Sequence, residues 1–162
     1  MDNIKRTVRR VETEQQLSLL EGSVPEEQAR QTERNDSGFV DPDPEQLYFG
    51  SMKLRDFLDQ MDLGWVIGLR DFVRSLNFAE FEESYSLKGR PPYAPAAMVG
   101  LVLYGLMKGR RSLRELEEMA RSDLGAIWMS GGIFPDHSIL GRFLVRHREA
   151  LSASMFEELT RR

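Results

Sequence analysis

The segment from Pro95 to Met107 constrains the fold of this chain more than any other stretch, because almost every residue in it is apolar. A helix formed by these residues would present apolar side chains, among them Met98, Leu101 and Tyr104, on all of its faces. The segment is far shorter than the roughly 20 residues that cross a bilayer. It therefore predicts a helix at the centre of a bundle, with Pro95 in its first turn, rather than a transmembrane span.

Apolar side chains also recur at helical spacing before this segment. The spacing predicts short amphipathic helices over about residues 54–61 and 65–76, followed by a third apolar stripe through Phe78, Phe81 and Tyr85. We interpret these three aromatic residues as core residues rather than as platforms for nucleic-acid bases. The prolines of the next stretch, from Lys88 to Pro95, break the periodicity and predict an extended connector.

The residues after the apolar helix carry recognisable helix boundaries. Ser112 and Glu115 have the spacing of a capping box, in which each side chain satisfies a backbone donor of the other residue. A helix is therefore expected to start at this point. Ser122-Asp123 can start a further short helix, and the glycine pair at residues 131–132 closes it.

Two capped helices separated by a short, turn-bounded piece resemble a helix-turn-helix, whose second helix enters the major groove of DNA. Here the second helix is predicted over about residues 139–148, behind the cap candidates Asp136 and Ser138. The intervening stretch from Ser122 to Phe134 is longer than the usual tight turn, which favours a three-helix variant. A last helix is predicted from about Ser152 to Thr160.

The first 44 residues have the composition of an unfolded leader. They are rich in charged and polar residues and contain no aromatic residue before Phe39, so they lack the apolar surface that would offset chain ordering. A few apolar residues at near-helical spacing leave open an arm that folds on a partner. Because the prolines of Asp41–Pro44 favour extended backbone, they predict the domain boundary. We expect a flexible acidic leader over 1–44 and, over 45–162, an all-α orthogonal bundle of short helices with a helix-turn-helix-like carboxy-terminal part.

Composition narrows the function classes. The chain has no cysteine and two histidines, which excludes disulfide frameworks, thiolate zinc sites and cysteine nucleophiles. A reducing, cytoplasmic setting fits, and no signal peptide is read at the amino terminus. Residues 1–87 hold 10 Lys or Arg against 18 Asp or Glu, whereas residues 88–162 hold 12 against 8. A basic half within an acidic chain is a hint of nucleic-acid contact.

Arginines give the basic half a candidate binding site. Arginine suits phosphates and guanine edges because its planar guanidinium donates two parallel hydrogen bonds. Ser138, Arg142 and Arg146 share one flank of a predicted helix and give it a basic edge. The alternative interpretation of these charges is an ordinary solvated helix surface. The candidate DNA-binding residues are Arg90, Arg110, Arg111, Arg114, Arg142, Arg146 and Arg148.

Residues typical of catalytic and metal sites form no recognisable motif. Asp136-His137 joins one carboxylate to one imidazole, which is too few ligands for a metal, so capping is the favoured role. His147 falls on the apolar side of its helix and is interpreted as a packed, neutral histidine. The sequence contains no glycine-rich phosphate loop, nucleophile elbow or paired-histidine helix. We therefore expect no catalytic residue, no metal and no cofactor.

Four ordered motifs carry a resemblance to a known family. They are Gly89–Pro95, Leu103–Gly105, Gly109–Leu116 and Pro135–Phe143. Taken in this order, they resemble the InsH-type amino-terminal domain of bacterial insertion-sequence transposases, most densely over residues 89–148. The resemblance implies a helical domain that recognises the terminal inverted repeats of the mobile element in double-stranded DNA.

In that family the helical domain precedes a metal-dependent catalytic domain of ribonuclease-H-like fold with an Asp-Asp-Glu triad. The sequence ends at Arg162 without a β-rich region of that size. We therefore expect a truncated transposase or transposase-derived fragment that binds DNA without cutting it. The alternative is a protein-interaction module that pairs with a second copy or with a full-length transposase as an inhibitor. An intact enzyme with an unrecognised carboxylate site and a decayed remnant without function also remain open.

Overall fold

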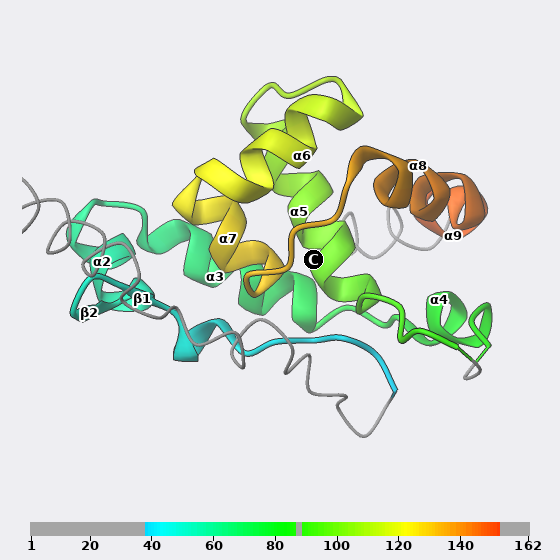
Figure 1. The fold of residues 1–162 in the computed structure, drawn as a ribbon, viewed down its shortest axis with the longest axis horizontal. Coiled ribbons are helices and arrows are strands. Elements are labelled where there is room, and N and C mark those ends of the chain that lie inside the picture. Colours follow the sequence, from blue (N-terminus) through cyan, green and yellow to red (C-terminus); the bar gives the residue numbers. More distant parts are fainter. Residues whose placement is uncertain (1–37, 87–88, 153–162) are drawn as a thin grey trace, which may run out of the picture. The chain divides into compact units, whose positions relative to one another are not determined.

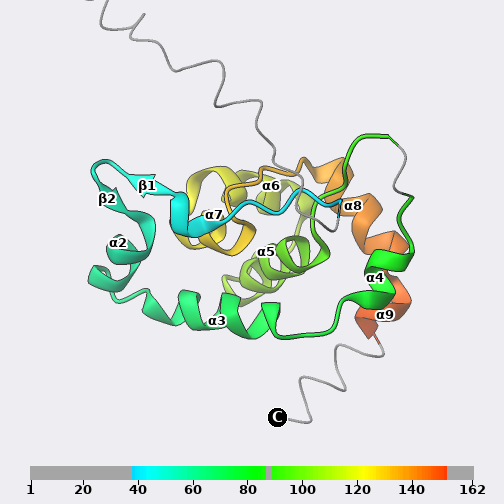
Figure 2. The same cartoon turned by 90° about the horizontal axis from the view of Figure 1, so that it is seen from below.

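The computed structural model describes residues 38–86 and 89–152 (Figures 1 and 2). This part of the chain is mostly helical, as predicted, and holds eight α-helices and one two-stranded antiparallel hairpin. The helices are α2 (Leu54–Gln60), α3 (Gly64–Arg74), α4 (Ala79–Glu83), α5 (Pro95–Met107), α6 (Leu113–Ser122), α7 (Leu124–Ser130), α8 (His137–Arg146) and α9 (Arg148–Ser152). The hairpin pairs β1 (Tyr48–Phe49) with β2 (Met52–Lys53), after a short 3-10 turn over Pro44–Gln46. The leader up to residue 37, Lys88 and most of the predicted last helix lie outside the described residues.

Helix α5 lies at the centre of the fold, as its apolar sequence predicts. Figure 2 shows it between α3 on one side and α6 and α7 on the other, and it packs against all three. Gly105 allows the close approach of α6, because a Cβ atom at this position would overlap the side chain of Leu116. At the carboxy-terminal end of the helix, Leu106 and Met107 are exposed. None of the helices within the described residues has the length and apolar character needed to cross a membrane.

The predicted caps start helices α6, α7 and α8. The capping box of Ser112 and Glu115 starts α6, with both reciprocal hydrogen bonds formed. The side chain of Asp123 accepts a hydrogen bond from the backbone of α7, and that of Asp136 does the same for α8. Gly131 ends α7 in the left-handed conformation, with a φ of 70°. The boundaries in this region follow the sequence because each depends on residues only a few positions apart.

The described fold begins earlier than the predicted boundary at residues 44–45. Phe39 and Val40 are both 4% exposed, so they belong to the core rather than to a leader. The backbone of Val40 pairs with the connector, where it donates to Pro92 O at 2.8 Å and accepts from Ala94 N at 2.9 Å. This segment folds onto the domain because the connector satisfies its backbone hydrogen-bonding groups, and burial of the two adjacent apolar side chains then stabilises it.

A buried arginine ties α3 to the end of α7. Arg70 is 5% exposed, and its guanidinium donates to the backbone oxygens of Trp128, at 3.0 Å, and Met129. Burial, together with the nearby charge of Arg74, lowers the pKa of Arg70 to about 10. The group therefore remains charged at neutral pH and satisfies carbonyls at the carboxy-terminal end of α7. Its position within the apolar stripe of α3, between Ile67 and Val73, was the sequence signal for this role.

Candidate functional site

The seven candidate arginines are all exposed on the surface. Arg142 and Arg146 lie on α8, where they follow Ser138 along one exposed edge, as the sequence predicts. Arg148 opens α9, and Arg90 belongs to the connector before α5. Of the remaining three, Arg114 lies in the first turn of α6, and Arg110 and Arg111 directly precede its cap residue Ser112.

Ion pairing divides the arginines of the described residues into two groups. Arg55, Arg74 and Arg121 each form an ion pair, with Glu45, Asp41 and Glu117 respectively, and the buried Arg70 binds backbone carbonyls. None of the seven candidate arginines forms an ion pair with a described residue. The candidate set therefore consists of the exposed arginines that form no ion pair within this part of the chain.

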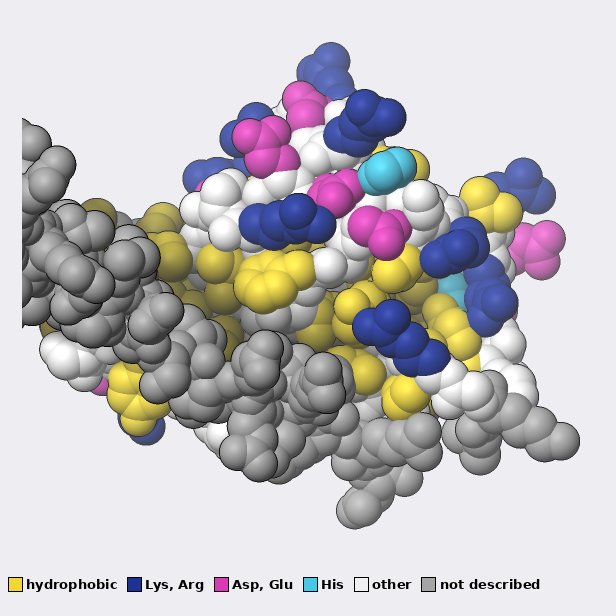
Figure 3. Space-filling view, in the orientation of Figure 1, with side chains coloured by type: hydrophobic (Ala, Val, Ile, Leu, Met, Phe, Trp, Pro, Cys, Tyr) yellow, Lys and Arg dark blue, Asp and Glu magenta, His cyan; other side chains and the backbone are white. Residues whose placement is uncertain are grey.

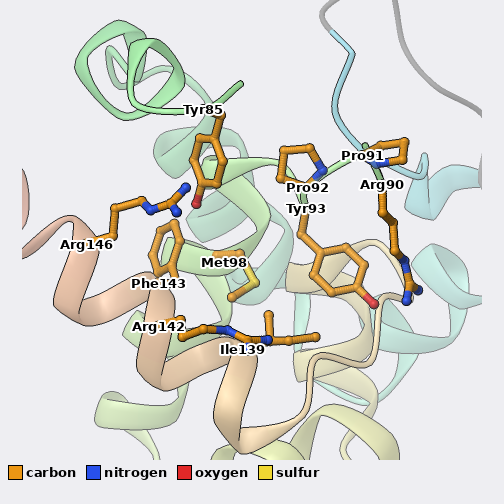
Figure 4. Close-up of a pocket in the computed structure, with 10 residues that line it drawn as sticks. All are labelled: Tyr85, Arg90, Pro91, Pro92, Tyr93, Met98, Ile139, Arg142, Phe143 and Arg146. Carbon is orange, nitrogen blue, oxygen red and sulfur yellow. The ribbon is translucent and has the colours of Figure 1, made fainter. Parts of the chain in front are cut away.

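A groove beside α8 brings three of the candidate arginines together. Its cavity has a volume of about 280 Å³ and lies between the connector and α8. Figure 4 shows Arg90 and Tyr93 coming from the connector, whereas Arg142, Phe143 and Arg146 come from α8. The other lining residues are Tyr85, Pro91, Pro92, Met98 and Ile139. The other four candidate arginines lie outside this groove.

The charge around the groove differs from that along α6. Figure 3 shows Lys and Arg side chains interleaved with acidic ones over α6, and dark blue side chains around apolar surface over α8. The sequence of α6 explains the mixture, because Arg114 is followed by Glu115, Glu117 and Glu118. No carboxylate lines the groove among the described residues. The groove is thus the place where candidate arginines combine with apolar side chains in a cavity that no described carboxylate lines.

An aromatic cluster fixes the carboxy-terminal end of α8 to α4. Phe143 and His147 pack with their ring centroids 4.7 Å apart, and Phe81 of α4 lies 4.8 Å from His147. His147 is 3% exposed, and its Nε2 lies 3.0 Å from the hydroxyl of Tyr85. The guanidinium of Arg146 lies over the Tyr85 ring at 4.7 Å. The interpretation of His147 as a packed histidine, and of Phe81 as a core residue, is confirmed.

His147 makes the stability of this cluster depend on pH. Burial and the neighbouring charge of Arg146 lower the pKa of His147 from its ordinary value. The unfolded chain therefore binds this proton more readily than the folded one, and stability should fall as the pH drops below about 6.5. The expected loss is about 1.4 kcal/mol for each pH unit that separates the folded and unfolded pKa values. Urea denaturation between about pH 7.5 and 5 measures it.

A His147→Gln variant is the control for this prediction. Its amide nitrogen can reach the position of the imidazole Nε2 and donate a hydrogen bond to Tyr85, but it does not titrate, so its stability should change less over the same pH range. The carboxylates with lowered pKa values, Glu115, Glu117 and Asp136, titrate below this window and do not interfere. An equal pH dependence in the wild type and the variant would assign the effect to another group.

Contacts between α6 and α8 fix the orientation of the basic edge. The carboxylate of Glu117 accepts a hydrogen bond from the backbone N of His137 at 3.0 Å and lies 2.7 Å from the Nδ1 of its ring. Farther along, Gly141 faces Leu113, and a Cβ atom on Gly141 would lie 3.2 Å from that side chain. Asp136 caps α8, which confirms the capping role. No group of three or more His, Asp or Glu side chains among the described residues could hold a metal ion.

Sequence reasoning identified Arg90 on the connector side of the site but missed the aromatic residues beside it. Tyr93 was part of a motif but received no role, and Tyr85 was assigned to the core alone, although it also lines the groove. A signal was present in the run Arg90-Pro91-Pro92-Tyr93, which presents an arginine and a tyrosine on a proline-stiffened extended segment. The sequence could not show that this segment lies beside α8, because the two are far apart in the chain.

One comparison with known proteins identifies a family. The model of the family described as "Transposase domain (DUF772)" matches residues 54–146. The matched range runs from the start of α2 to the end of α8 and includes the connector and the groove arginines. Comparisons with curated proteins and with solved structures find no match to the chain.

Proposed function

Because the chain belongs to this family of transposase domains, we propose that its helical domain is the DNA-binding module of an insertion-sequence transposase. The module would recognise the terminal inverted repeats of the mobile element, as the InsH-type resemblance implies. Its ligand would be double-stranded DNA, and it would serve in DNA transposition. The resemblance also implies that cutting and joining belong to a separate Asp-Asp-Glu catalytic domain of such transposases.

The observation that carries this proposal is the division of the arginines. Three of the exposed or half-buried arginines of this domain are paired with carboxylates. Here four arginines are used within the fold, whereas the seven candidates face solvent without a carboxylate partner in the described residues. Unpaired guanidinium groups on one connected set of elements are suited to a polyanion.

The arrangement of α6, α7 and α8 suits a three-helix variant of the helix-turn-helix. Helix α8 would be the recognition helix, since it presents Arg142 and Arg146 along an exposed edge and is held by α6 through Glu117. Arg110, Arg111 and Arg114 would then contact phosphates at the amino-terminal end of α6. The phosphate contacts would set the position of the module, and the α8 arginines would reach base edges.

A salt titration tests the proposal with the full chain. Contacts of Arg110, Arg111 and Arg114 with three phosphates release enough counterions to give a slope of about −2.7 when log affinity is plotted against log salt concentration. We expect this slope on a duplex that carries the inverted repeat of the element, measured by fluorescence anisotropy. A duplex of the same length and base composition in scrambled order should bind at least about tenfold more weakly.

Two outcomes would contradict the proposal. Equal affinity for the repeat and the scrambled duplex would remove sequence recognition, and a flat salt response would remove phosphate contact.

The second candidate function is a protein-interaction module, favoured by the exposed aromatic pair Tyr48 and Phe49 on the hairpin, which are 62% and 49% exposed. Concentration-dependent association with a second copy or with full-length transposase, in the absence of DNA binding, would support that function instead.

A further inference from the structure

The groove beside α8 combines two kinds of surface that the proposed contacts to duplex DNA do not both require. Its charged part consists of Arg90, Arg142 and Arg146, which approach from opposite walls. Its apolar part consists of three rings and four aliphatic or proline side chains, among them Tyr93 and Phe143. Phosphate contact alone needs the arginines but not a recessed apolar floor.

The charges select an anionic occupant. The three guanidinium groups line the same cavity, and no carboxylate lines it among the described residues. They form no ion pair with a described carboxylate, so a ligand would not have to displace one. An uncharged peptide or a lipid chain would leave these cations without a partner.

The rings select a planar body. Tyr85 is already engaged by Arg146 and by the hydroxyl contact with His147, and Phe143 packs on His147. The ring of Tyr93 is not part of any aromatic pair found within residues 38–86 and 89–152. In Figure 4 it extends from the connector between Met98 and Arg90. Tyr93 is therefore the aromatic side chain of the groove that could stack on a planar ligand.

The size of the groove favours a single nucleotide. A cavity of about 280 Å³ is near the lower limit of small-ligand pockets, which begin at about 300 Å³. Within a duplex, both faces of every internal base are covered by its neighbours, so an aromatic side chain in this recessed groove is suited to a base that has left the helix. A ring flanked by arginines is the arrangement that binds unpaired strands by stacking and charge.

We propose that this groove binds one unpaired nucleotide of a DNA strand, with its base against Tyr93 and its phosphates on Arg90, Arg142 and Arg146. The inference rests on the proposed function, because the same α8 edge would face the duplex from which the strand emerges. It adds that the domain prefers DNA in which a base is already unpaired, for example at a frayed or nicked end.

The test compares two probes with the full chain by fluorescence anisotropy. One is a blunt duplex that carries the inverted repeat, and the other is the same duplex with a short overhang of thymidines. We expect the overhang probe to bind roughly tenfold more tightly. Tyr93→Leu should bind both probes with equal affinity, whereas Tyr93→Phe should keep the preference. Thermal unfolding of both variants checks that the fold is intact.

The outcomes separate the two proposals. Equal affinity for both probes would overturn the nucleotide site and leave duplex recognition standing. A preference for the overhang that survives in Tyr93→Leu would also overturn it. Binding to neither probe would overturn both proposals, whereas binding to the overhang probe alone would support the groove and contradict duplex recognition. If thymidine 5′-monophosphate occupied the groove as tightly as the overhang, the ligand would be a free nucleotide and not a strand.

Discussion

Replacement of Gly131 by alanine is expected to destabilise the domain by about 3 kcal/mol. Gly131 ends α7 at a φ of 70°, a conformation that costs an L-residue with a side chain roughly 1 kcal/mol or more. A Cβ atom at this position would also meet the backbone carbonyl of Pro42 well inside van der Waals contact. A backbone atom cannot rotate away as a side-chain end can, so the segment that holds Phe39 and Val40 would have to move.

The control for this prediction is Gly109→Ala. Gly109 has a similar φ of 74°, but a Cβ atom there would have no atom within 4 Å. This variant should lose only the conformational part, about 1 kcal/mol. Urea denaturation of both variants gives the free energies of unfolding, and their difference isolates the contact with Pro42. Equal losses would mean that the approach of Pro42 does not require glycine.

Removal of two charges from α8, as Arg142→Gln with Arg146→Gln, is expected to weaken binding to the inverted-repeat duplex on the order of a hundredfold. Both side chains are exposed and form no ion pair with a described carboxylate, so the main loss should fall on binding, and the contact of Arg146 with the Tyr85 ring should cost about 0.5–1 kcal/mol of stability. If both contact phosphates, the salt dependence should also become shallower, by a slope of about 1.8. Anisotropy titrations at several salt concentrations measure the two effects.

A matched double variant separates the position of the charges from their number. Arg55→Gln with Arg121→Gln removes the same two charges, but these arginines are paired with Glu45 and Glu117. It should change the affinity only a few-fold, through the net charge of the chain. If both double variants weakened binding equally, Arg142 and Arg146 would have no special role in binding DNA.

The local part of the fold could be predicted from the sequence. The caps at Ser112, Asp123 and Asp136 act within a few residues, and the span of α5 follows from its apolar run between a proline and Gly109. Amphipathic spacing likewise predicted α2 and α3. These features depend on near neighbours, so reading the chain in order was sufficient.

The long-range part could not be predicted in the same way. Phe39 and Val40 stand in a polar stretch without periodicity, and their burial depends on a connector far along the chain. For the same reason the pattern gave Tyr93 no neighbours, although the arginines that line the groove with it were all identified. The role of those arginines in binding DNA remains a prediction.

The pairing of Val40 with the connector has a consequence for the order of folding. During synthesis, residues 39–41 leave the ribosome well before residues 92–94, which hold them in place through backbone hydrogen bonds. Helices α6 and α8 pack against each other within a short stretch of sequence, so this pair can form quickly once made. The wall of the groove that contains Tyr93 is the connector, and it is complete only when the early segment around Val40 has paired with it. A kinetic experiment on refolding should therefore find the environment of Tyr93 among the last to become native.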